Sequence, residues 1–239
     1  MSSEVSVGYY ISHKPRLLKD FDKAARSVGP VLTHYAGDQA EALIQEARRE
    51  YEMLIPDLPY VGGRQPFTQF LIFTAWYLAM YRVLKAHGRT VEETGQIAYQ
   101  VSHAFLQTYP RIVLRLLGSR RFSRRHIAEA RRRAAESLSR PYPGDWVYTF
   151  VEGDGEHFDW GVDYTECGAY EFLKSHGAGE LAQYLCPVDI LYSDAFGWGL
   201  MRTSTLAEGY DCCDFRFKKG GRTQVAVPEA MREIVAQKR

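Results

Sequence analysis

The sequence predicts an α+β fold, in which an N-terminal layer of helices packs on a C-terminal antiparallel sheet. Apolar residues recur with helical spacing through residues 1–140, whereas in residues 141–239 β-branched and aromatic residues alternate with polar ones. A Pro-Tyr-Pro-Gly turn at residues 141–144 marks the change. Segregated helices and strands are typical of the α+β class, and we expect the two regions to form one compact unit.

Two amphipathic helices are expected first. One is expected to end at Gly29-Pro30, and the other spans residues 38–53 with Asp38 as its N-cap. The prolines and glycines of residues 55–67 then predict an ordered loop. Its Gly62-Gly63-Arg64 segment is either a rigid connector, which is the more common case, or a small anion-binding turn.

A third helix, over residues 66–87, is apolar on most faces, which places it in the middle of a helix bundle. Gly88 is expected to end this helix, because glycine tolerates the left-handed conformation found there. Thr90 and Glu93, three residues apart, predict a capping box at the start of the next helix.

Residues 111–140 carry ten arginines and include a helix over residues 124–139 with Ser123 as its N-cap. Nucleic-acid binding would require aromatic or groove-reading residues between the arginines and a basic chain overall. The net charge is only +1, and the aromatic interleaving is missing. We interpret this segment as a solvated helix face or a subunit contact in a homo-oligomer, with a polyanion-binding patch as the alternative.

The C-terminal region predicts the element order ββααββ. The first two strands form a hairpin around a Gly-Asp turn. In chain order the elements are strands at 146–151 and 158–166, helices at 167–176 and 180–189, strands at 200–206 and 212–218, and a surface helix at 228–237.

The bulk composition gives no reason to expect a nucleic-acid or membrane partner, because the net charge is close to zero. The most apolar run, residues 67–81, contains 15 residues. Spanning a bilayer takes about 20. Four cysteines without regular spacing, and no secretory signal at the Met1 end, predict a soluble protein of the reducing cytoplasm.

The reactive side chains concentrate in residues 186–217, which contain three of the four cysteines. Strand alternation over residues 212–218 places Cys213 on an apolar face and directs Asp214 and Arg216 to the opposite face. Buried packing is therefore the favoured interpretation of Cys213. Asp214 and Arg216 lie close enough to pair with each other or to hold a polar ligand.

Cys186 and Asp189 are three residues apart and share one side of a helical turn. An aspartate raises the pKa of a neighbouring thiol, so Asp189 is better suited to general acid–base chemistry or to binding a substrate nitrogen. Cys186 is either a packing residue or a nucleophile. A nucleophilic Cys186 would need a nearby cation, which Arg202 or His157 could supply.

The sequence provides no motif for a metal or a cofactor. A zinc site would have to be assembled from distant ligands, because the chain lacks a CxxC or HxxxH pair; the candidates are Cys167, Cys186, Cys213 and His157. No phosphate-binding loop, dinucleotide fingerprint or serine nucleophile elbow is present. We therefore expect a small-molecule ligand without a bound cofactor or metal.

Several of these segments together resemble the L-2-amino-thiazoline-4-carboxylic acid hydrolase family. The resemblance extends from about residue 38 to residue 218. It is carried by the LPYVGG loop, the helix pair that follows it, the isolated Cys167, the CPVD turn and, most specifically, the closing segment RTSTLAEGYDCCDFRF. The closing strands are also weakly similar to 4-vinyl-reductase-type small-ligand domains.

The resemblance implies a hydrolase that opens a small cyclic amidine by attack at the ring C–N bond. Such a reaction needs an activated nucleophile, an acid for the leaving nitrogen and a cation for the substrate carboxylate. The paired candidates for these roles are Cys186 or Cys213, Asp189 or Asp214, and Arg202 or Arg216. Cys167 and His157 are expected to line the same site.

Two other functions fit the same resemblance. A member of the family could use the pocket for a lyase, isomerase or reductase step on a small cyclic acid. A non-catalytic small-ligand sensor would agree with the vinyl-reductase-like ending.

Overall fold

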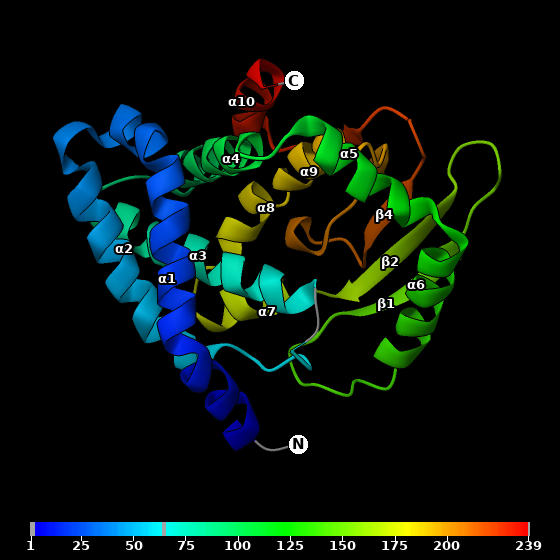
Figure 1. Ribbon diagram of the computed structural model, residues 1–239, viewed down its shortest axis with the longest axis horizontal. Helices are drawn as coiled ribbons and strands as arrows, with labels where there is room; N and C mark the ends of the chain where they lie inside the picture. Colours follow the sequence, from blue (N-terminus) through cyan, green and yellow to red (C-terminus); the bar gives the residue numbers. More distant parts are fainter. Residues whose placement is uncertain (1–2, 64–65, 239) are drawn as a thin grey trace.

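The computed structural model describes residues 3–63 and 66–238, with helices in the N-terminal part and a sheet in the C-terminal part (Figure 1). The protein is therefore of the α+β class, as predicted. The N-terminal helices are α1 (Ser3–Ala36), α2 (Ala40–Leu54), α3 (Phe67–Ala86), α4 (Val91–Gln107), α5 (Arg111–Ser119) and α6 (Arg124–Ser137). The later elements are β1 (Val147–Glu152), β2 (Trp160–Glu166), α7 (Gly168–Ser175), α8 (Ala182–Leu185), α9 (Val188–Phe196), β3 (Leu200–Arg202), β4 (Cys213–Phe217), β5 (Gln224–Val225) and α10 (Arg232–Gln237).

Helix α1 is longer than the sequence suggested. It continues through Pro15 and Pro30, so the predicted end at Gly29-Pro30 is wrong. An internal proline costs a helix roughly 3 kcal/mol, but burial of one face of α1 against the other helices offsets that cost. A short 3-10 turn, Gly37–Gln39, then leads into α2, so Gln39 rather than Asp38 is its N-cap.

The other two predicted N-caps, Thr90 and Ser123, are confirmed. The Glu93 backbone N–H donates to Thr90 Oγ1 at 3.2 Å, and the Thr90 N–H donates to Glu93 Oε2 at 2.9 Å, which completes the capping box of α4. Ser123 caps α6 by accepting from the His126 N–H at 3.2 Å. Arg64 lies outside the described residues, so the anion-binding turn at Gly62-Gly63-Arg64 stays a prediction.

The sheet is mixed rather than purely antiparallel. Its strand order is β1-β2-β4-β3-β5, with every pairing antiparallel except the parallel pairing of β3 with β5. After β4 the chain crosses to the other side of β3. There β5 pairs parallel to β3 and forms the edge of the sheet. β3 is also shorter than predicted, because the Thr203 and Ser204 N–H groups donate to the Asp214 carboxylate instead of to a strand.

The chain bends at Pro187 between β2 and β3. The predicted helix at 180–189 is therefore divided: α8 ends at Leu185, and α9 begins after Pro187, which is its N-cap. Three helices, α7, α8 and α9, thus separate β2 from β3. The bend directs the first turn of α9 toward the end of β3, since Asp189 in that turn contacts Arg202.

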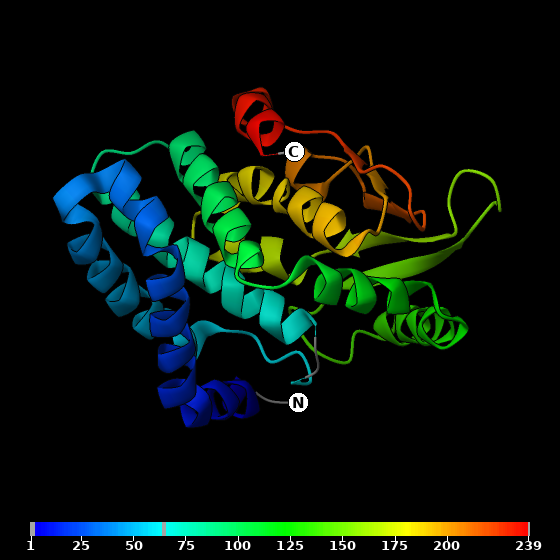
Figure 2. The same cartoon turned by 45° about the horizontal axis from the view of Figure 1, so that its top comes forward.

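The sheet has one packed and one polar face, as strand alternation in β4 predicted. Cys213, Phe215 and Phe217 pair with Tyr164, Val162 and Trp160 of β2 on the inner face. Helices cover this face, and one buried cluster extends from α1–α3 to the sheet (Figures 1 and 2). Among the described residues, no helix combines the length and hydrophobicity needed to cross a membrane.

Candidate active site

Five of the eight residues predicted for the site lie together at the inner face of the sheet. Cys167 is the N-cap of α7, and Cys186 lies in the turn between α8 and α9. Asp189 lies in the first turn of α9, Arg202 ends β3 and Cys213 begins β4. These side chains are close enough for their charges to affect one another: the pKa of Cys186 responds to Arg202 and Asp189.

A buried ion pair forms the centre of this group. Arg202 Nη1 donates to Asp189 Oδ2 at 2.5 Å, and Arg202 Nη2 donates to the Cys186 carbonyl at 3.3 Å. The Arg202 guanidinium also lies over the Phe215 ring, 5.2 Å from its centroid. Burial by itself would lower the pKa of Arg202, but the neighbouring Asp189 carboxylate raises it above its ordinary value.

The Asp189 carboxylate faces accessible space although protein surrounds it on most sides. Its side chain keeps 40% of its exposure, whereas that of Arg202 keeps 2%. Burial raises the pKa of Asp189, and the attraction of Arg202 opposes this shift. A partly solvent-accessible carboxyl group whose pKa is raised is suited to proton transfer.

The three grouped thiols are poor nucleophiles in the free protein. Burial raises the pKa values of Cys167, Cys186 and Cys213 to about 12 each. The Arg202 charge lowers the pKa of Cys186 only in part, because Asp189 acts in the opposite direction. Since the thiolate is the nucleophilic form, this environment favours protonated packing residues.

Sequence reasoning missed Arg121, which lies in a 3-10 turn between α5 and α6. Its guanidinium carbon lies 5.2 Å, 4.3 Å and 4.1 Å from the ring centroids of Trp160, Trp198 and Phe217. Its Nε atom is buried without a hydrogen-bond partner, and Arg121 forms no ion pair with any residue in 3–63 or 66–238. Burial lowers its pKa to about 10, while Tyr164 and Asp189 act in the opposite direction.

Asp214 and Arg216 lie on the opposite face of the sheet and do not pair with each other. Asp214 Oδ1 accepts from the N–H groups of Thr203 and Ser204, at 2.8 Å and 2.6 Å, and so fixes the turn after β3. Arg216 Nη1 donates to Asp163 Oδ1 at 2.7 Å. Both side chains therefore stabilise the sheet and its turn, and neither lies in the group around Asp189.

His157 also lies apart from the group. It belongs to the loop between β1 and β2, which projects from the body of the protein (Figures 1 and 2). Its side chain is exposed, and its Nδ1 lies 2.8 Å from Asp154 Oδ2. Within the described part of the chain, no three His, Cys, Asp or Glu side chains are placed to hold a metal ion.

The family model for L-2-amino-thiazoline-4-carboxylic acid hydrolase matches residues 69–217, which is more than half of the chain. The chain belongs to this family. No curated protein and no solved structure gives a significant match. The matched region includes Asp189, Arg202 and Arg121, whereas α1 and α2 lie outside it.

Proposed function

We propose that the protein hydrolyses a small cyclic amidine carboxylate of the aminothiazoline type, at the site formed by Asp189, Arg202 and Arg121. Family membership supports the reaction class. The charge balance supports the substrate class, because two guanidinium groups face one carboxylate and leave an excess of one positive charge. Arg121 carries the proposal, as a partly buried cation whose Nε is buried and which has no acidic partner among the described residues.

Arg121 is the group that we assign to the substrate carboxylate. Its three aromatic neighbours fix the plane of the guanidinium, so little conformational freedom is lost when an anion binds. A planar carboxylate matches the donor geometry of a guanidinium and would satisfy the buried Nε. Arg202 is less suited to this role, because the Asp189 carboxylate already balances its charge; its Nη1 and Nη2 donate to Asp189 and the Cys186 carbonyl, and only its Nε lacks a partner.

Asp189 is the group that we assign to proton transfer. The oxygen of water bonds to the ring carbon between nitrogen and sulfur, and the ring C–N bond then breaks. Both water hydrogens end on the ring nitrogen, and the former ring carbon becomes a carbonyl. Asp189 takes a proton from the water and delivers it to the nitrogen, while Arg202 holds the carboxylate in position.

Turnover of the aminothiazoline carboxylate by the purified protein tests the reaction. Breaking the C–N bond releases a primary amine, whereas breaking the C–S bond would release a thiol that reacts with a thiol reagent. We expect amine to appear in proportion to substrate consumed. The appearance of thiol would refute the assigned bond, and the absence of turnover would refute the reaction.

Arg121→Gln tests the carboxylate assignment, with exposed Arg120→Gln as the matched control. Losing a charged hydrogen bond is expected to weaken binding of the acid roughly tenfold to a hundredfold. Binding of the same ring without its carboxylate is expected to change little. If both ligands lose affinity equally, or if the control behaves like Arg121→Gln, Arg121 does not bind the carboxylate.

A further inference from the structure

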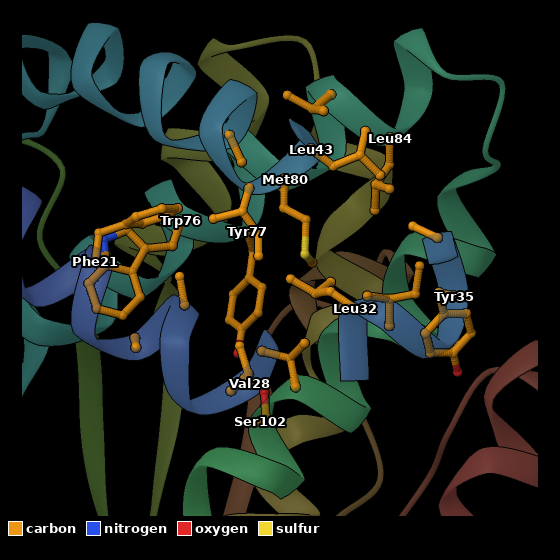
Figure 3. A pocket seen from close by; sticks show the side chains of 18 of the residues that line it. Phe21, Val28, Leu32, Tyr35, Leu43, Trp76, Tyr77, Met80, Leu84 and Ser102 are labelled. Carbon is orange, nitrogen blue, oxygen red and sulfur yellow. Dashed lines mark hydrogen bonds between the residues drawn. The ribbon is translucent and has the colours of Figure 1, made fainter. Parts of the chain in front are cut away.

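The helical layer contains a ligand-sized cavity whose lining includes none of the residues grouped around Asp189. This cavity has a volume of about 270 Å³ and lies between α1, α2, α3 and α4, with Tyr192 of α9 also lining it. Figure 3 shows Leu32, Leu43, Met80 and other apolar side chains directed into it. Water finds few hydrogen-bond partners in a cavity lined by apolar side chains. Such a cavity therefore favours an apolar ligand.

One polar pair interrupts the apolar wall. Tyr77 Oη lies 2.5 Å from Ser102 Oγ, and Ser102 Oγ donates its hydrogen to the Ala98 carbonyl at 2.7 Å. Ser102 has a single hydrogen, so Tyr77 must be the donor in the Tyr77–Ser102 bond. The Tyr77 oxygen then retains a lone pair that can accept, and a ligand meeting it needs one hydrogen-bond donor.

Three other polar side chains of the lining already have partners of their own: Tyr35 with Gln100, His87 with Glu46 and Arg89 with Glu93. Trp76 Nε1 is buried without a hydrogen-bond partner, but an indole N–H can only donate and so does not replace Tyr77 as the acceptor for a ligand donor. Because Glu46 and Glu93 balance the two basic groups, the rim carries no excess charge that would favour a carboxylate.

We propose that this cavity binds an elongated apolar molecule with one hydrogen-bond-donating group, of the class of a medium-chain aliphatic alcohol. An engineered apolar cavity of about 150 Å³ takes a benzene-sized ligand, so this space accommodates on the order of ten heavy atoms. The walls contributed by α1 and α2 lie outside the residues that match the family, whereas those of α3 and α4 lie inside them.

Two isomers, n-nonanol and methyl octyl ether, test the proposal by calorimetry and thermal stabilisation. We expect one molecule of nonanol per chain, and the ether, which has no donor, is expected to bind roughly three- to tenfold more weakly. Tyr77→Phe is expected to remove this difference. Equal affinity for the two isomers in the wild-type protein, or no binding of either, would overturn the proposal.

The location is tested by Met80→Trp, which fills the cavity and is expected to abolish binding. Met53→Trp is the matched control, because Met53 lies on α2 outside the cavity and is exposed. If Met80→Trp fails to fold, Leu32→Trp on α1 provides the same test. Unchanged nonanol binding in a folded cavity-filled variant would place the ligand elsewhere and refute the assignment.

A different observation carries a second inference, about the surface of α5. Ile112 and Leu116 are 71% and 64% exposed, and Val113 and Leu117 are exposed beside them. The opposite side of α5 packs on α9, where Gly118 abuts Phe196. The exposed apolar residues therefore form a face that no described residue of the chain covers.

The charged residues of the segment that contains this face are all basic. Residues 108–128 contain no acidic residue. The exposed arginines among them are Arg111, Arg115, Arg120, Arg124 and Arg125, and none of these forms an ion pair within the described ranges. Docking of a second copy through the same face would bring these arginines together, which like-charge repulsion disfavours.

We infer that α5 docks on an anionic lipid surface, with its apolar face in the headgroup region and the arginines against the lipid charges. The expectation that the chain has no membrane partner rests on the net charge of the whole chain, which does not describe this local distribution. An amphipathic helix of this kind lies on a membrane without crossing it.

Co-sedimentation with vesicles tests this inference. We expect binding to phosphatidylcholine vesicles that contain phosphatidylglycerol, and little binding to phosphatidylcholine alone. The Ile112→Ser/Leu116→Ser variant is expected to lose binding, and each arginine replaced by glutamine to weaken it roughly fivefold. The matched control is Ile11→Ser/Met53→Ser, two exposed apolar residues elsewhere. Equal binding by both double variants, or no preference for anionic vesicles, would refute it.

Discussion

Replacing Asp189 by asparagine measures how strongly the buried ion pair supports the site. The variant removes the negative charge beside a guanidinium that is 2% exposed, and leaves it only neutral acceptors, the new amide oxygen and the Cys186 carbonyl at 3.3 Å. Removing one partner of a fully buried pair costs about 3–5 kcal/mol. Because 40% of the Asp189 side chain is exposed, solvent replaces part of the interaction, and we expect a loss of about 2 kcal/mol in the free energy of unfolding.

Urea unfolding of a double-mutant cycle with Arg202→Met provides the assay. We expect the double variant to be more stable than the sum of the single losses predicts, by about 1 kcal/mol or more. Glu152→Gln is the control, since it breaks the exposed pair with Arg131 and is expected to cost below about 1 kcal/mol. No coupling between Asp189 and Arg202, or equal costs of Asp189→Asn and Glu152→Gln, would refute the reasoning.

Three further results are expected. Gly118→Ala places a methyl group 1.9 Å from the Phe196 carbonyl oxygen and should cost about 2 kcal/mol or more in urea unfolding, whereas Gly29→Ala meets nothing within 4 Å and should stabilise α1. Iodoacetamide should modify Cys212 first, as mapped by mass spectrometry; faster modification of Cys186 would restore the nucleophile hypothesis. Burial raises the pKa of Cys186 to about 12, so its protonated thiol stabilises the fold fully below about pH 8.5, and this contribution is lost as the pH rises toward 12. Cys186→Ala should therefore lose less unfolding free energy than the wild-type protein over this alkaline range. An identical loss in the variant and the wild-type protein would contradict this expectation.

Local rules predicted the features that depend on a few neighbouring residues. The Thr90 capping box needs only residues 90–93, and the two faces of β4 follow from alternation over five residues. The sequence likewise brought Asp189 and Arg202 into consideration, since both lie in the segment that resembles the family. Their pairing, however, depends on the bend at Pro187 and could not be read from either residue alone.

Arg121 could not be found in this way. It is one of ten arginines in residues 111–140, and only the distant Trp160 and Trp198 distinguish it from its solvated neighbours. The course of α1 through Pro30 has a similar cause, because burial against other helices outweighs the local preference of proline. Both features depend on contacts between segments far apart in the chain.

Helix α9 contributes both to the group around Asp189 and to the cavity. Asp189 in its first turn pairs with Arg202, and Tyr192, three residues later, lines the cavity together with Tyr77. The charges of Asp189 and Tyr77 both act on the pKa of Tyr192, which burial raises. A molecule in the cavity therefore contacts the helix that carries Asp189. Binding at two sites is coupled reciprocally. If a molecule in the cavity changes the affinity of a ligand at Asp189 by some factor, that ligand changes the affinity of the cavity for the molecule by the same factor.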